Sequence, residues 1–419
     1  MKRFISLMTP QWVKNIYHLS SAVVANVYFG FPAKKLRVIG ITGTNGKTTT
    51  TQMIGAILRE ADKKTAVAST IDFWMGEEQR VNNSKFTTTS AWLLQKFLRE
   101  AVSKGCEYAV IETSSHALDQ SRVWGIPYEI AVMTNVTREH LDYHHTMEEY
   151  RKAKRKLFLG STYAVINADM EAPEYFAEAV VKHENVRFYS TKNKDAALYG
   201  ASIRLNFSHT EFMVGQEEYT LHIPGFFNIE NALAAISVAR ILEIDADVTK
   251  RALKQMAGIP GRMECLESKE GVDIIIDYAV TPDAFEKLYA SVRPLKIPGT
   301  KIIHVFGACG DRDRGKRPIL GTIASEYADI VILTNEDPYF EDGEQIINEI
   351  EAGISRKRGN QYIRIYDRRE AIAKAIELAE QGDIILVTGK GAETSMAIGD
   401  KRIPWSERQV IEEELAKKE

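Results

Sequence analysis

Short apolar runs alternate with amphipathic segments through the first half of the chain. The apolar run at 37–42 is followed by a helical pattern over 48–61, and the run at 129–134 is followed by another over 146–158. A further apolar run covers 107–112. This alternation is typical of βα units and predicts a mainly parallel sheet.

The pattern changes between residues 196 and 222, where short segments with alternating polar and apolar residues predict an antiparallel patch. An alanine-rich helix is expected over 229–242. After the glycine and proline residues of 258–261 the βα rhythm returns and predicts a doubly wound domain. Its expected strands lie at 274–278, 301–307, 329–334 and 383–389.

These changes divide the chain into three parts. We expect a short helical N-terminal segment at 1–36, a central domain at 37–258 and a C-terminal Rossmann-like domain at 259–419. The cluster at 258–261 is the candidate hinge between the two larger domains. The predicted fold class is therefore α/β, with an antiparallel patch inside the central domain.

The N-terminal segment begins with Lys2 and Arg3, as a signal peptide can, but polar residues interrupt its apolar stretch. No run of about 20 apolar residues is available to span a bilayer. Apolar side chains instead recur at helical spacing, at Trp12, Ile16, Leu19, Val23, Val27 and Tyr28. Two interpretations follow: an amphipathic helix docked on the protein's own core, or a helix that binds a membrane surface or a partner.

Composition narrows the class of protein. With 419 residues and 44% apolar content, the chain can bury more than one core. A net charge of -3 gives no basic field for bulk nucleic-acid binding. The three cysteines, Cys106, Cys265 and Cys309, are far apart and match no zinc or redox spacing, so we expect a reducing compartment, the cytoplasm.

The stretch VIGITGTNGKTTT at 38–50 has the form of a strand that turns through glycines onto a helix. Backbone amides of such a turn can surround phosphate oxygens, Lys47 can reach the terminal phosphates, and the Thr48 hydroxyl can ligate Mg²⁺. The glycine spacing departs from that of the common P-loop, and a glycine-rich turn without a ligand is the alternative. The candidate nucleotide-binding residues here are Gly43, Thr44, Asn45, Gly46, Lys47, Thr48 and Thr49.

Three further residues suggest a metal site near this loop. Glu112 ends an apolar run at the carboxyl edge of an expected strand, where a metal-facing carboxylate would lie. His140 falls on a loop after another strand, and Lys154 falls on the helix that follows it. A free ammonium group near Mg²⁺ would be electrostatically unfavourable, so Lys154 needs a separate explanation.

The chain resembles the Mur ligase family, and most closely its MurE-type tripeptide synthetases, over roughly residues 37–410. The motifs that carry the resemblance are GTNGKTTT, ETSSHALDQSR, TNVTREHLDYH, YRKAKRKLF, FNIENALAA, PGRME and FGACGDRDRGKRP. The resemblance implies an ATP- and Mg²⁺-dependent, ADP-forming amide ligase of peptidoglycan synthesis, which supports cell shape. ATP would convert an acceptor carboxylate into an acyl phosphate, and an amine would then displace phosphate.

The resemblance also implies roles for individual residues. Lys154 matches a lysine that is carbamylated in the family, which turns a cation into an anionic group. The implied catalytic residues are Lys47, Lys154, His140 and Glu112, and the implied metal site comprises Thr48, Glu112, His140 and Lys154. Nucleotide contacts are further implied for Asn231, Arg262, Asp277, Asp311, Arg312 and Lys316. The acceptor dipeptide and the incoming amino acid would contact Thr87, Thr88, Ser114, Gln120, Arg122, Asp337, Tyr339 and Glu393.

Three departures from the family pattern bear on the substrate. Family members that add diaminopimelate usually carry Asn-Pro-Arg, whereas this chain has Asp337-Pro338-Tyr339 and so lacks that arginine clamp. Val280 and Ala392 replace two motif histidines. Residues 1–36 stand where the family has a domain that binds UDP, so the acceptor is either UDP-linked without a dedicated uridine site, or a lipid-linked or nucleotide-free peptide.

An acidic neighbourhood lies beside the altered motif, at Glu336, Asp337, Glu341 and Asp342. It suits a cationic side chain such as that of lysine, and a solvated acidic loop is the alternative.

We therefore expect a ligase that adds a diamino acid, L-lysine or diaminopimelate, to a muramoyl-L-Ala-D-Glu-type acceptor. The alternatives are a ligase of the wider family with a folylpolyglutamate-like or cyanophycin-like acceptor, and a catalytically weak ATP-binding subunit of a partner complex. The expected partners are a cell-wall peptide precursor and a free amino acid, with no nucleic acid. We expect a cytoplasmic monomer, with contact at the inner membrane surface through the N-terminal helix as an alternative.

Overall fold

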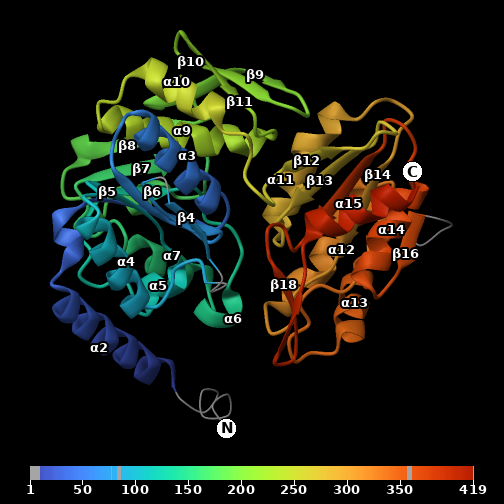
Figure 1. The fold of residues 1–419 in the computed structure, drawn as a ribbon, viewed down its shortest axis with the longest axis horizontal. Helices are drawn as coiled ribbons and strands as arrows, with labels where there is room; N and C mark the ends of the chain where they lie inside the picture. The colour runs from blue at the N-terminus through green and yellow to red at the C-terminus, as the bar shows by residue number, and fades with distance from the viewer. Residues whose placement is uncertain (1–9, 77, 83–85, 356–360, 419) are drawn as a thin grey trace.

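Two α/β bodies lie side by side in the computed structural model, with one long helix along the edge of the first body (Figure 1). The structure describes residues 10–76, 78–82, 86–355 and 361–418. The helix is α2 (Gln11–Phe29), and the short 3₁₀ turn η1 (Pro32–Lys35) joins it to the first strand. We call residues 37–255 the large-sheet body and residues 264–418 the small-sheet body.

The large-sheet body is built on an eleven-stranded sheet with the order β11-β10-β9-β8-β7-β6-β1-β5-β2-β3-β4. The strands from β9 to β2 in this order are parallel, and both edges are antiparallel. The strand bounds are β1 (Arg37–Thr42), β2 (Thr65–Ala68), β3 (Asp72–Met75), β4 (Glu78–Val81), β5 (Tyr108–Glu112), β6 (Tyr128–Met133), β7 (Tyr163–Asn167), β8 (Val186–Ser190), β9 (Leu198–Leu205), β10 (Thr210–Val214) and β11 (Glu217–Leu221).

Helices cover both faces of this sheet because its central strands are apolar on both sides. In β1, Val38 packs into one core, and Ile39 and Ile41 pack into the other. The first core includes residues of α4 (Ala91–Ser103) and α5 (Ser115–Asp119), and the second includes residues of α3 (Lys47–Glu60), α9 (Phe226–Ile241) and α10 (Ala246–Gln255). The remaining helical turns are α6 (Leu141–His144), α7 (Met147–Arg155), α8 (Glu174–Ala177) and η2 (His183–Asn185).

The small-sheet body has a six-stranded sheet with the order β12-β13-β17-β14-β15-β16, in which only β12 is antiparallel to its neighbour. A separate hairpin, β18–β19, follows it. The strands are β12 (Glu264–Glu267), β13 (Asp273–Asp277), β14 (Ile302–Phe306), β15 (Ile330–Leu333), β16 (Tyr362–Arg364), β17 (Ile384–Thr388), β18 (Ser395–Ile398) and β19 (Lys401–Pro404). The helices are α11 (Pro282–Val292), η3 (Arg293–Leu295), η4 (Arg314–Lys316), α12 (Arg317–Tyr327), α13 (Gly343–Glu351), α14 (Arg368–Leu378) and α15 (Glu407–Lys418).

The sequence-based fold class is confirmed, and most expected strands match within one residue. The antiparallel patch is present as β9, β10 and β11. The alanine-rich helix begins earlier than expected, at Phe226, and the antiparallel edge strands β3 and β4 were not predicted. The domain boundary at residue 258 stays a prediction.

The N-terminal helix forms as expected, but its apolar stripe is not the side that docks. Trp12, Ile16 and Tyr28 are 66%, 56% and 70% exposed, whereas Ala22, Ala25 and Asn26 are buried against the body. Small residues allow a close approach of the helix backbone, so Ala22 and Ala25, with Asn26, form the buried part of the contact. The interpretation of that stripe as a core-docking face is therefore wrong.

Candidate active site

The phosphate loop joins β1 to the start of α3. Gly46 has φ +83, and a Cβ at this position would lie 2.2 Å from Oδ1 of Asn231. Asn135, at the end of β6, holds the loop from the side: its Oδ1 accepts from the Asn45 amide at 2.9 Å, and its Nδ2 donates to the Asn45 carbonyl at 3.1 Å. The loop therefore has a fixed shape with the helix N-terminus behind it, as phosphate binding requires.

Lys47 is half-buried and bends back over the loop. Its Nζ donates a hydrogen bond of 2.8 Å to the Thr44 carbonyl. Burial lowers the pKa of Lys47, an effect that the nearby Glu112 carboxylate opposes. An anionic ligand would strengthen the charged form of this lysine, since opposite charges stabilise each other most where water is excluded.

Thr48 and Glu112 face each other as predicted. Thr48 Oγ1 lies 3.1 Å from both carboxylate oxygens of Glu112, which comes from the carboxyl end of β5. The backbone amide of Thr70 also donates to Glu112, at 2.7 Å. The carboxylate is thus oriented from two sides, with its oxygens directed at the start of α3.

Lys154 and His140 are the other two residues of the predicted metal site, which stays a prediction. Lys154 is 1% exposed on α7, and its Nζ donates a hydrogen bond of 2.7 Å to the Gly43 carbonyl. Burial, with a further contribution from Lys47, lowers the pKa of Lys154 well below its ordinary value. His140 starts α6 with a left-handed backbone, and burial likewise lowers its pKa well below the ordinary value.

The residues present fit a Mg²⁺ ion that is shared with a nucleotide. The described residues contain no group of three or more His, Cys, Asp or Glu side chains that could hold a metal by themselves. Thr48 and Glu112 do offer hard oxygen atoms beside the phosphate loop. Mg²⁺ typically takes one or two protein oxygens and completes its shell with phosphate oxygens and water, so this small set suits it.

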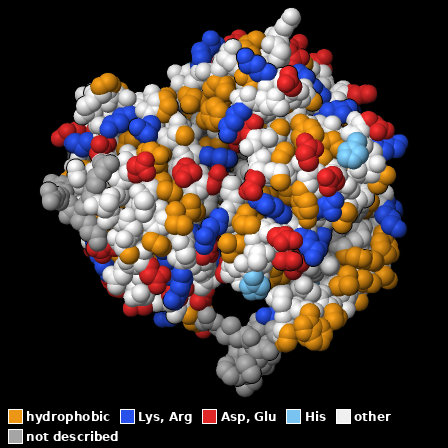
Figure 2. Space-filling model, turned by 180° about the vertical axis from the view of Figure 1, so that it is seen from behind, with side chains coloured by type: hydrophobic (Ala, Val, Ile, Leu, Met, Phe, Trp, Pro, Cys, Tyr) orange, Lys and Arg blue, Asp and Glu red, His pale blue; other side chains and the backbone are white. Residues whose placement is uncertain are grey.

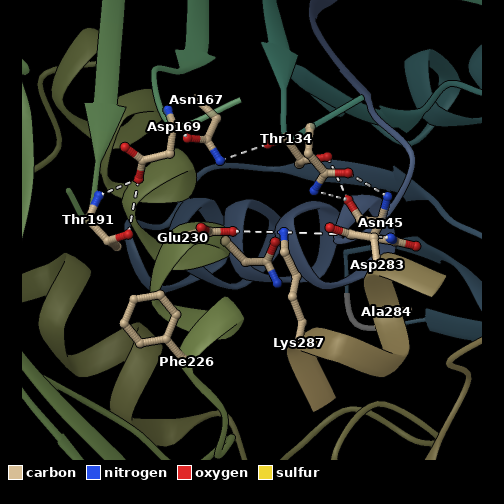
Figure 3. Close-up of polar contacts among 12 residues, drawn as sticks. Asn45, Thr134, Asn167, Asp169, Thr191, Phe226, Glu230, Asp283, Ala284 and Lys287 are labelled. Carbon is tan, nitrogen blue, oxygen red and sulfur yellow. Dashed lines mark hydrogen bonds and ion pairs between the residues drawn. The ribbon is translucent and has the colours of Figure 1, made fainter. Parts of the chain in front are cut away.

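A cleft of about 410 Å³ opens between the two bodies and includes the phosphate loop. Polar contacts cross between the bodies next to the loop (Figure 3). Asn45 Nδ2 donates to Asp283 Oδ2 at 2.8 Å, and Lys287 Nζ lies 3.3 Å from Glu230 Oε2. On the other side, Lys316 Nζ lies 3.2 Å from Glu139 Oε1. The phosphate loop is therefore enclosed by both bodies.

The residues expected to contact the nucleotide lie around this cleft. Those that line it are Asn231, Arg262, Asp277, Arg312 and Lys316, whereas Asp311 lies beside it and its amide donates to Glu341 at 2.6 Å. The Arg262 guanidinium lies 4.5 Å from the centre of the Tyr278 ring. Burial raises the pKa of Asp277, whose Oδ2 accepts from the Met263 amide. Val280 and Ala392, which replace the two family histidines, also line the cleft.

The predicted acceptor residues form one connected group. Thr88 Oγ1 accepts from the Ser114 amide at 2.9 Å and donates to the Glu112 carbonyl at 2.9 Å, which ties it to the metal-facing strand. Arg122 Nη1 donates to the Thr88 carbonyl at 2.6 Å. Gln120 directly follows α5, two residues before Arg122, and Thr87 lines the cleft. Thr88, Ser114 and Arg122 are therefore linked by hydrogen bonds to the strand end that carries Glu112, and an acceptor role for the group stays a prediction.

The residues expected to hold the incoming amino acid lie together in the small-sheet body. Asp337 is 2% exposed and accepts from Lys390 Nζ at 2.8 Å; Lys390 also contacts Glu393. The Tyr278 hydroxyl lies 3.5 Å from Glu393 Oε1. Lys390 was not predicted as a site residue, although it lies two residues before Ala392, which replaces a motif histidine. The buried lysine offsets the charge of one of the two carboxylates, so the group keeps an excess of negative charge.

The four acidic residues near Tyr339 do not form one loop cluster, so the solvated-loop interpretation is wrong. Glu336 and Asp337 are both 2% exposed, whereas Asp342 caps α13 and Glu341 pairs with Arg317 at 2.9 Å. Two guanidinium groups flank the Tyr339 ring: Arg312 at 5.7 Å and Arg402 at 5.2 Å from its centre.

Sequence reasoning missed several residues whose position depends on tertiary contacts. They include Asn135, His116, Glu139, Asp283, Lys390 and Arg402. The His116 ring lies 4.7 Å from that of His140, and burial lowers the pKa of His116 to about 3. His116 stands in the quoted SSHALDQ motif, which was the only available signal.

Family comparisons agree with this geometry. A family model described as the Mur ligase middle domain matches residues 41–239, and one described as Mur ligase, glutamate ligase domain, matches residues 261–391. The chain is 40% identical over 406 residues to a UDP-N-acetylmuramoyl-L-alanyl-D-glutamate--2,6-diaminopimelate ligase of Syntrophomonas wolfei, covering 94% of this chain and 81% of the relative. It is 38% identical over 418 residues to a UDP-N-acetylmuramyl-tripeptide synthetase of Roseiflexus sp., covering 94% and 81%.

Solved structures share the fold. A structure of a UDP-N-acetylmuramoyl-L-alanyl-D-glutamate--2,6-diaminopimelate ligase superposes with a TM-score of 0.64 at 32% identity, covering 91% of this chain and 79% of that one. A Mycobacterium tuberculosis folylpolyglutamate synthase gives a TM-score of 0.72 at 18% identity, covering 88% and 92%. At that lower identity the likeness concerns the fold alone.

Proposed function

Because the chain belongs to the Mur ligase family, we propose that it adds a diamino acid to a muramoyl-L-Ala-D-Glu-type acceptor in an ATP-dependent, ADP-forming reaction. The enzyme forms an amide bond in peptidoglycan synthesis. We assign the reaction to the cytoplasm, where ATP is supplied, and to a monomer that closes its middle domain (37–258) against its C-terminal domain (259–419).

One observation carries this proposal: the phosphate loop, Thr48, Glu112 and Thr87 line the same cleft, and Thr88, the residue after Thr87, is hydrogen-bonded to Glu112. Thr48 Oγ1 lies 3.1 Å from Glu112, and the Glu112 carbonyl accepts from Thr88. The strand end that orients the metal-facing carboxylate therefore also positions the acceptor group. An acceptor carboxylate held there would lie next to the terminal phosphate of a nucleotide on the loop.

The chemistry follows from this neighbourhood. An oxygen of the acceptor carboxylate attacks the γ-phosphorus of ATP, an O–P bond forms, and ADP leaves with the electron pair of the broken bond. The amine of the incoming amino acid then attacks the acyl carbon, a C–N bond forms, phosphate leaves and the amine loses a proton to solvent. Lys47 offsets negative charge on the phosphoryl oxygens during the first step.

Mg²⁺ bound by Thr48 and Glu112 would supply charge neutralisation for the phosphates. Lys154 is the residue least suited to such a site as a free amine, because an ammonium group there would repel both the ion and Lys47. We propose that Lys154 reacts with CO₂: its nitrogen forms a bond to the carbon, one proton is released, and an anionic carbamate results. Its burial beside the Gly43 carbonyl supports this assignment.

The amine pocket supports diaminopimelate as well as lysine. Tyr339 stands where the family clamp has arginine, but Arg402 lies beside its ring and offers a guanidinium group from the β18–β19 hairpin. A distal carboxylate of diaminopimelate could pair with this cation. Asp337, Lys390 and Glu393 are placed to hold the amino and carboxyl groups that are common to both amino acids.

The proposal is tested with the full chain, ATP, Mg²⁺ and UDP-muramoyl-L-Ala-D-Glu, with L-lysine and meso-diaminopimelate offered separately. Phosphate release and product mass are measured together. We expect a product with one of the two amino acids, no product with Lys47→Ala, and wild-type turnover with Lys182→Ala, an exposed lysine away from the cleft.

Each result separates the alternatives. Turnover with glutamate and a folate acceptor, but none with the muramoyl dipeptide, would replace this proposal by a folylpolyglutamate-like ligase. ATP binding without phosphate release for any acceptor would favour a binding subunit of a partner complex. Product formation only with a nucleotide-free or lipid-linked muramoyl dipeptide would keep the reaction and change the acceptor.

A further inference from the structure

The exposed half of α2 is almost entirely apolar. Its exposed side chains are Gln11, Trp12, Ile16, Tyr17, Leu19, Ser20, Val24, Val27 and Tyr28, and seven of these nine are apolar or aromatic. Together with Trp92 and Leu93 of α4 they form what we call the α2 face. Figure 2 shows orange side chains gathered at the lower right, over the end of the molecule where α2 lies. A patch of this kind on one side of a protein indicates a binding surface.

The opposite side of α2 is fixed to the body. Asn26 is fully buried, and its Nδ2 donates to the Ala22 and Trp124 carbonyls at 2.9 and 2.8 Å. The Tyr28 ring lies 4.9 Å from the ring of Trp92, which joins α2 to α4. These contacts hold one side of the helix against the body. The apolar side therefore faces outward although the helix itself is firmly docked.

Most charged side chains around the α2 face are basic, and the acidic Asp119, which accepts from Asn15, is paired with Lys156. Residues 1–59 contain no Asp or Glu, although the whole chain has 57 such residues and a net charge of -3. Exposed cations flank the face: Lys34 and Lys35 on η1, and Lys96 and Arg99 on α4. Trp12 lies at the first end of the helix and Tyr28 at the other. Apolar residues, aromatic ends and a basic rim together match the chemistry of an anionic lipid surface.

A second copy of the chain fits this surface less well. A symmetric dimer would bring the same patch of each copy together, so the basic rim would face itself. Among the described residues, no helix is long and apolar enough to cross a membrane. The charge of the rim therefore favours a lipid surface over a second copy of the chain as the occupant of the α2 face.

We propose that the α2 face docks the enzyme on the surface of an anionic phospholipid bilayer. Docking would also set the position of the acceptor site. Gln11 Nε2 donates to the Tyr143 hydroxyl at 2.9 Å, and Asn15 Nδ2 donates to Asp119 Oδ2 at 3.3 Å. Asp119 ends α5 and Tyr143 lies in α6, the two helices that carry His116 and follow His140. The acceptor entrance is therefore held beside the lipid surface, whatever the identity of the acceptor.

The test is co-sedimentation of the full chain with vesicles of phosphatidylcholine mixed with phosphatidylglycerol, and with vesicles of phosphatidylcholine alone. We expect sedimentation with the anionic vesicles that weakens as salt rises, because salt screens the basic rim. The double variant Ile16→Gln/Val24→Gln should bind at least fivefold more weakly. These side chains are 56% and 58% exposed, so the change leaves the core intact. Its matched control is Val181→Gln/Ile297→Gln, at side chains 87% and 57% exposed elsewhere, which should bind like wild type.

Lys34→Gln/Lys35→Gln should lower binding to the anionic vesicles and leave any binding to phosphatidylcholine unchanged. The proposal is overturned if the wild type does not sediment with anionic vesicles, or if Ile16→Gln/Val24→Gln sediments as the wild type does. A concentration-dependent dimer in light scattering that the same double variant abolishes would assign the α2 face to a second copy. None of these readouts requires ligase turnover, so failure here is distinguishable from failure of the proposed reaction.

Discussion

Lys154 Nζ donates a hydrogen bond of 2.7 Å to the carbonyl oxygen of Gly43 in the phosphate loop. The two residues are 111 positions apart in the sequence, so α7 brings this amine to the loop. Lys154 is 1% exposed and its pKa is lowered well below the ordinary value, first by burial and then by Lys47. A neutral amine in this position can react with CO₂, whereas an ammonium group cannot. Lys154 would therefore become an anionic neighbour of the phosphate loop only if its amine reacted with CO₂.

We expect Lys154→Arg to lower kcat by about 10²–10³-fold, because arginine keeps the cation and cannot carry a carbamate. Isotopically labelled bicarbonate should give a carbamate signal by NMR in the wild type and none in the variant. Lys152→Arg, on the exposed side of the same helix, should keep both signal and activity. An unchanged carbamate signal in Lys154→Arg would assign the modification to another lysine.

Glu112→Gln should weaken the use of Mg²⁺. The carboxylate lies 3.1 Å from Thr48 Oγ1, and its replacement removes the only charged oxygen of that pair. We expect a higher Mg²⁺ concentration at half-maximal rate and a fall in kcat of roughly 10²-fold. Glu107→Gln, an exposed change just before the same strand, is the control. A Mg²⁺ dependence equal to that of the wild type would remove Glu112 from the metal site.

Asp283→Ala should loosen closure of the two bodies over the loop. The Asp283 carboxylate accepts from Asn45 at 2.8 Å and lies 3.8 Å from Lys287, so it joins the small-sheet body to the phosphate loop. A looser cleft admits water to the acyl phosphate, and we expect phosphate release to exceed amide formation. The ratio of the two products is the measurement. The control is Asp247→Ala, at an exposed ion pair, which should leave this ratio unchanged. An unchanged ratio in Asp283→Ala would show that closure does not depend on Asp283.

Arg402→Gln tests which amine enters. If Arg402 pairs with the distal carboxylate of diaminopimelate, the variant should raise KM for diaminopimelate about tenfold, as loss of one charge-assisted contact predicts. KM for lysine should stay the same, because lysine has no distal carboxylate. Lys401→Gln, the adjacent exposed residue of the hairpin, is the control. Equal changes for both amines would show that Arg402 acts through the fold of the hairpin.

Glu341→Gln tests the electrostatic support of the small-sheet body. Hydrogen bonds from the buried Arg317 are the largest cause that lowers the pKa of Glu341 to about 2. This lowered pKa stabilises the fold fully above pH of about 4.5, the ordinary pKa, and the stabilisation is lost as pH falls toward 2. We expect the variant to lose about 2 kcal/mol of unfolding free energy at neutral pH, since Arg317 retains Glu349.

The deficit of Glu341→Gln should shrink as the pH falls below about 4.5, which urea unfolding at several pH values can measure. Glu412→Gln, at a pair that is 54% exposed, should change stability by less than about 0.5 kcal/mol. A deficit independent of pH would mean that shape rather than charge matters at this position.

Local sequence determined the elements and the phosphate loop. The strand at 37–42 was predicted correctly because a buried parallel strand is apolar on both faces. The turn after it was predicted correctly because a tight turn needs glycine. Both requirements are local. The sequence also located the motif residues on their elements: Thr48 at the start of α3, Glu112 at the end of β5, His140 on the loop before α6 and Lys154 on α7. Their common position was implied only by the resemblance.

Tertiary structure decided which groups meet across the chain. Asn45 with Asp283, Glu139 with Lys316, and Asp337 with Lys390 are separated by 238, 177 and 53 residues, and no local pattern links such pairs. The same holds for α2, where spacing correctly predicted a helix but not its docked side. The small residues Ala22 and Ala25 permit close packing of the helix against the body. The stripe of large apolar residues from Trp12 to Tyr28 therefore faces outward.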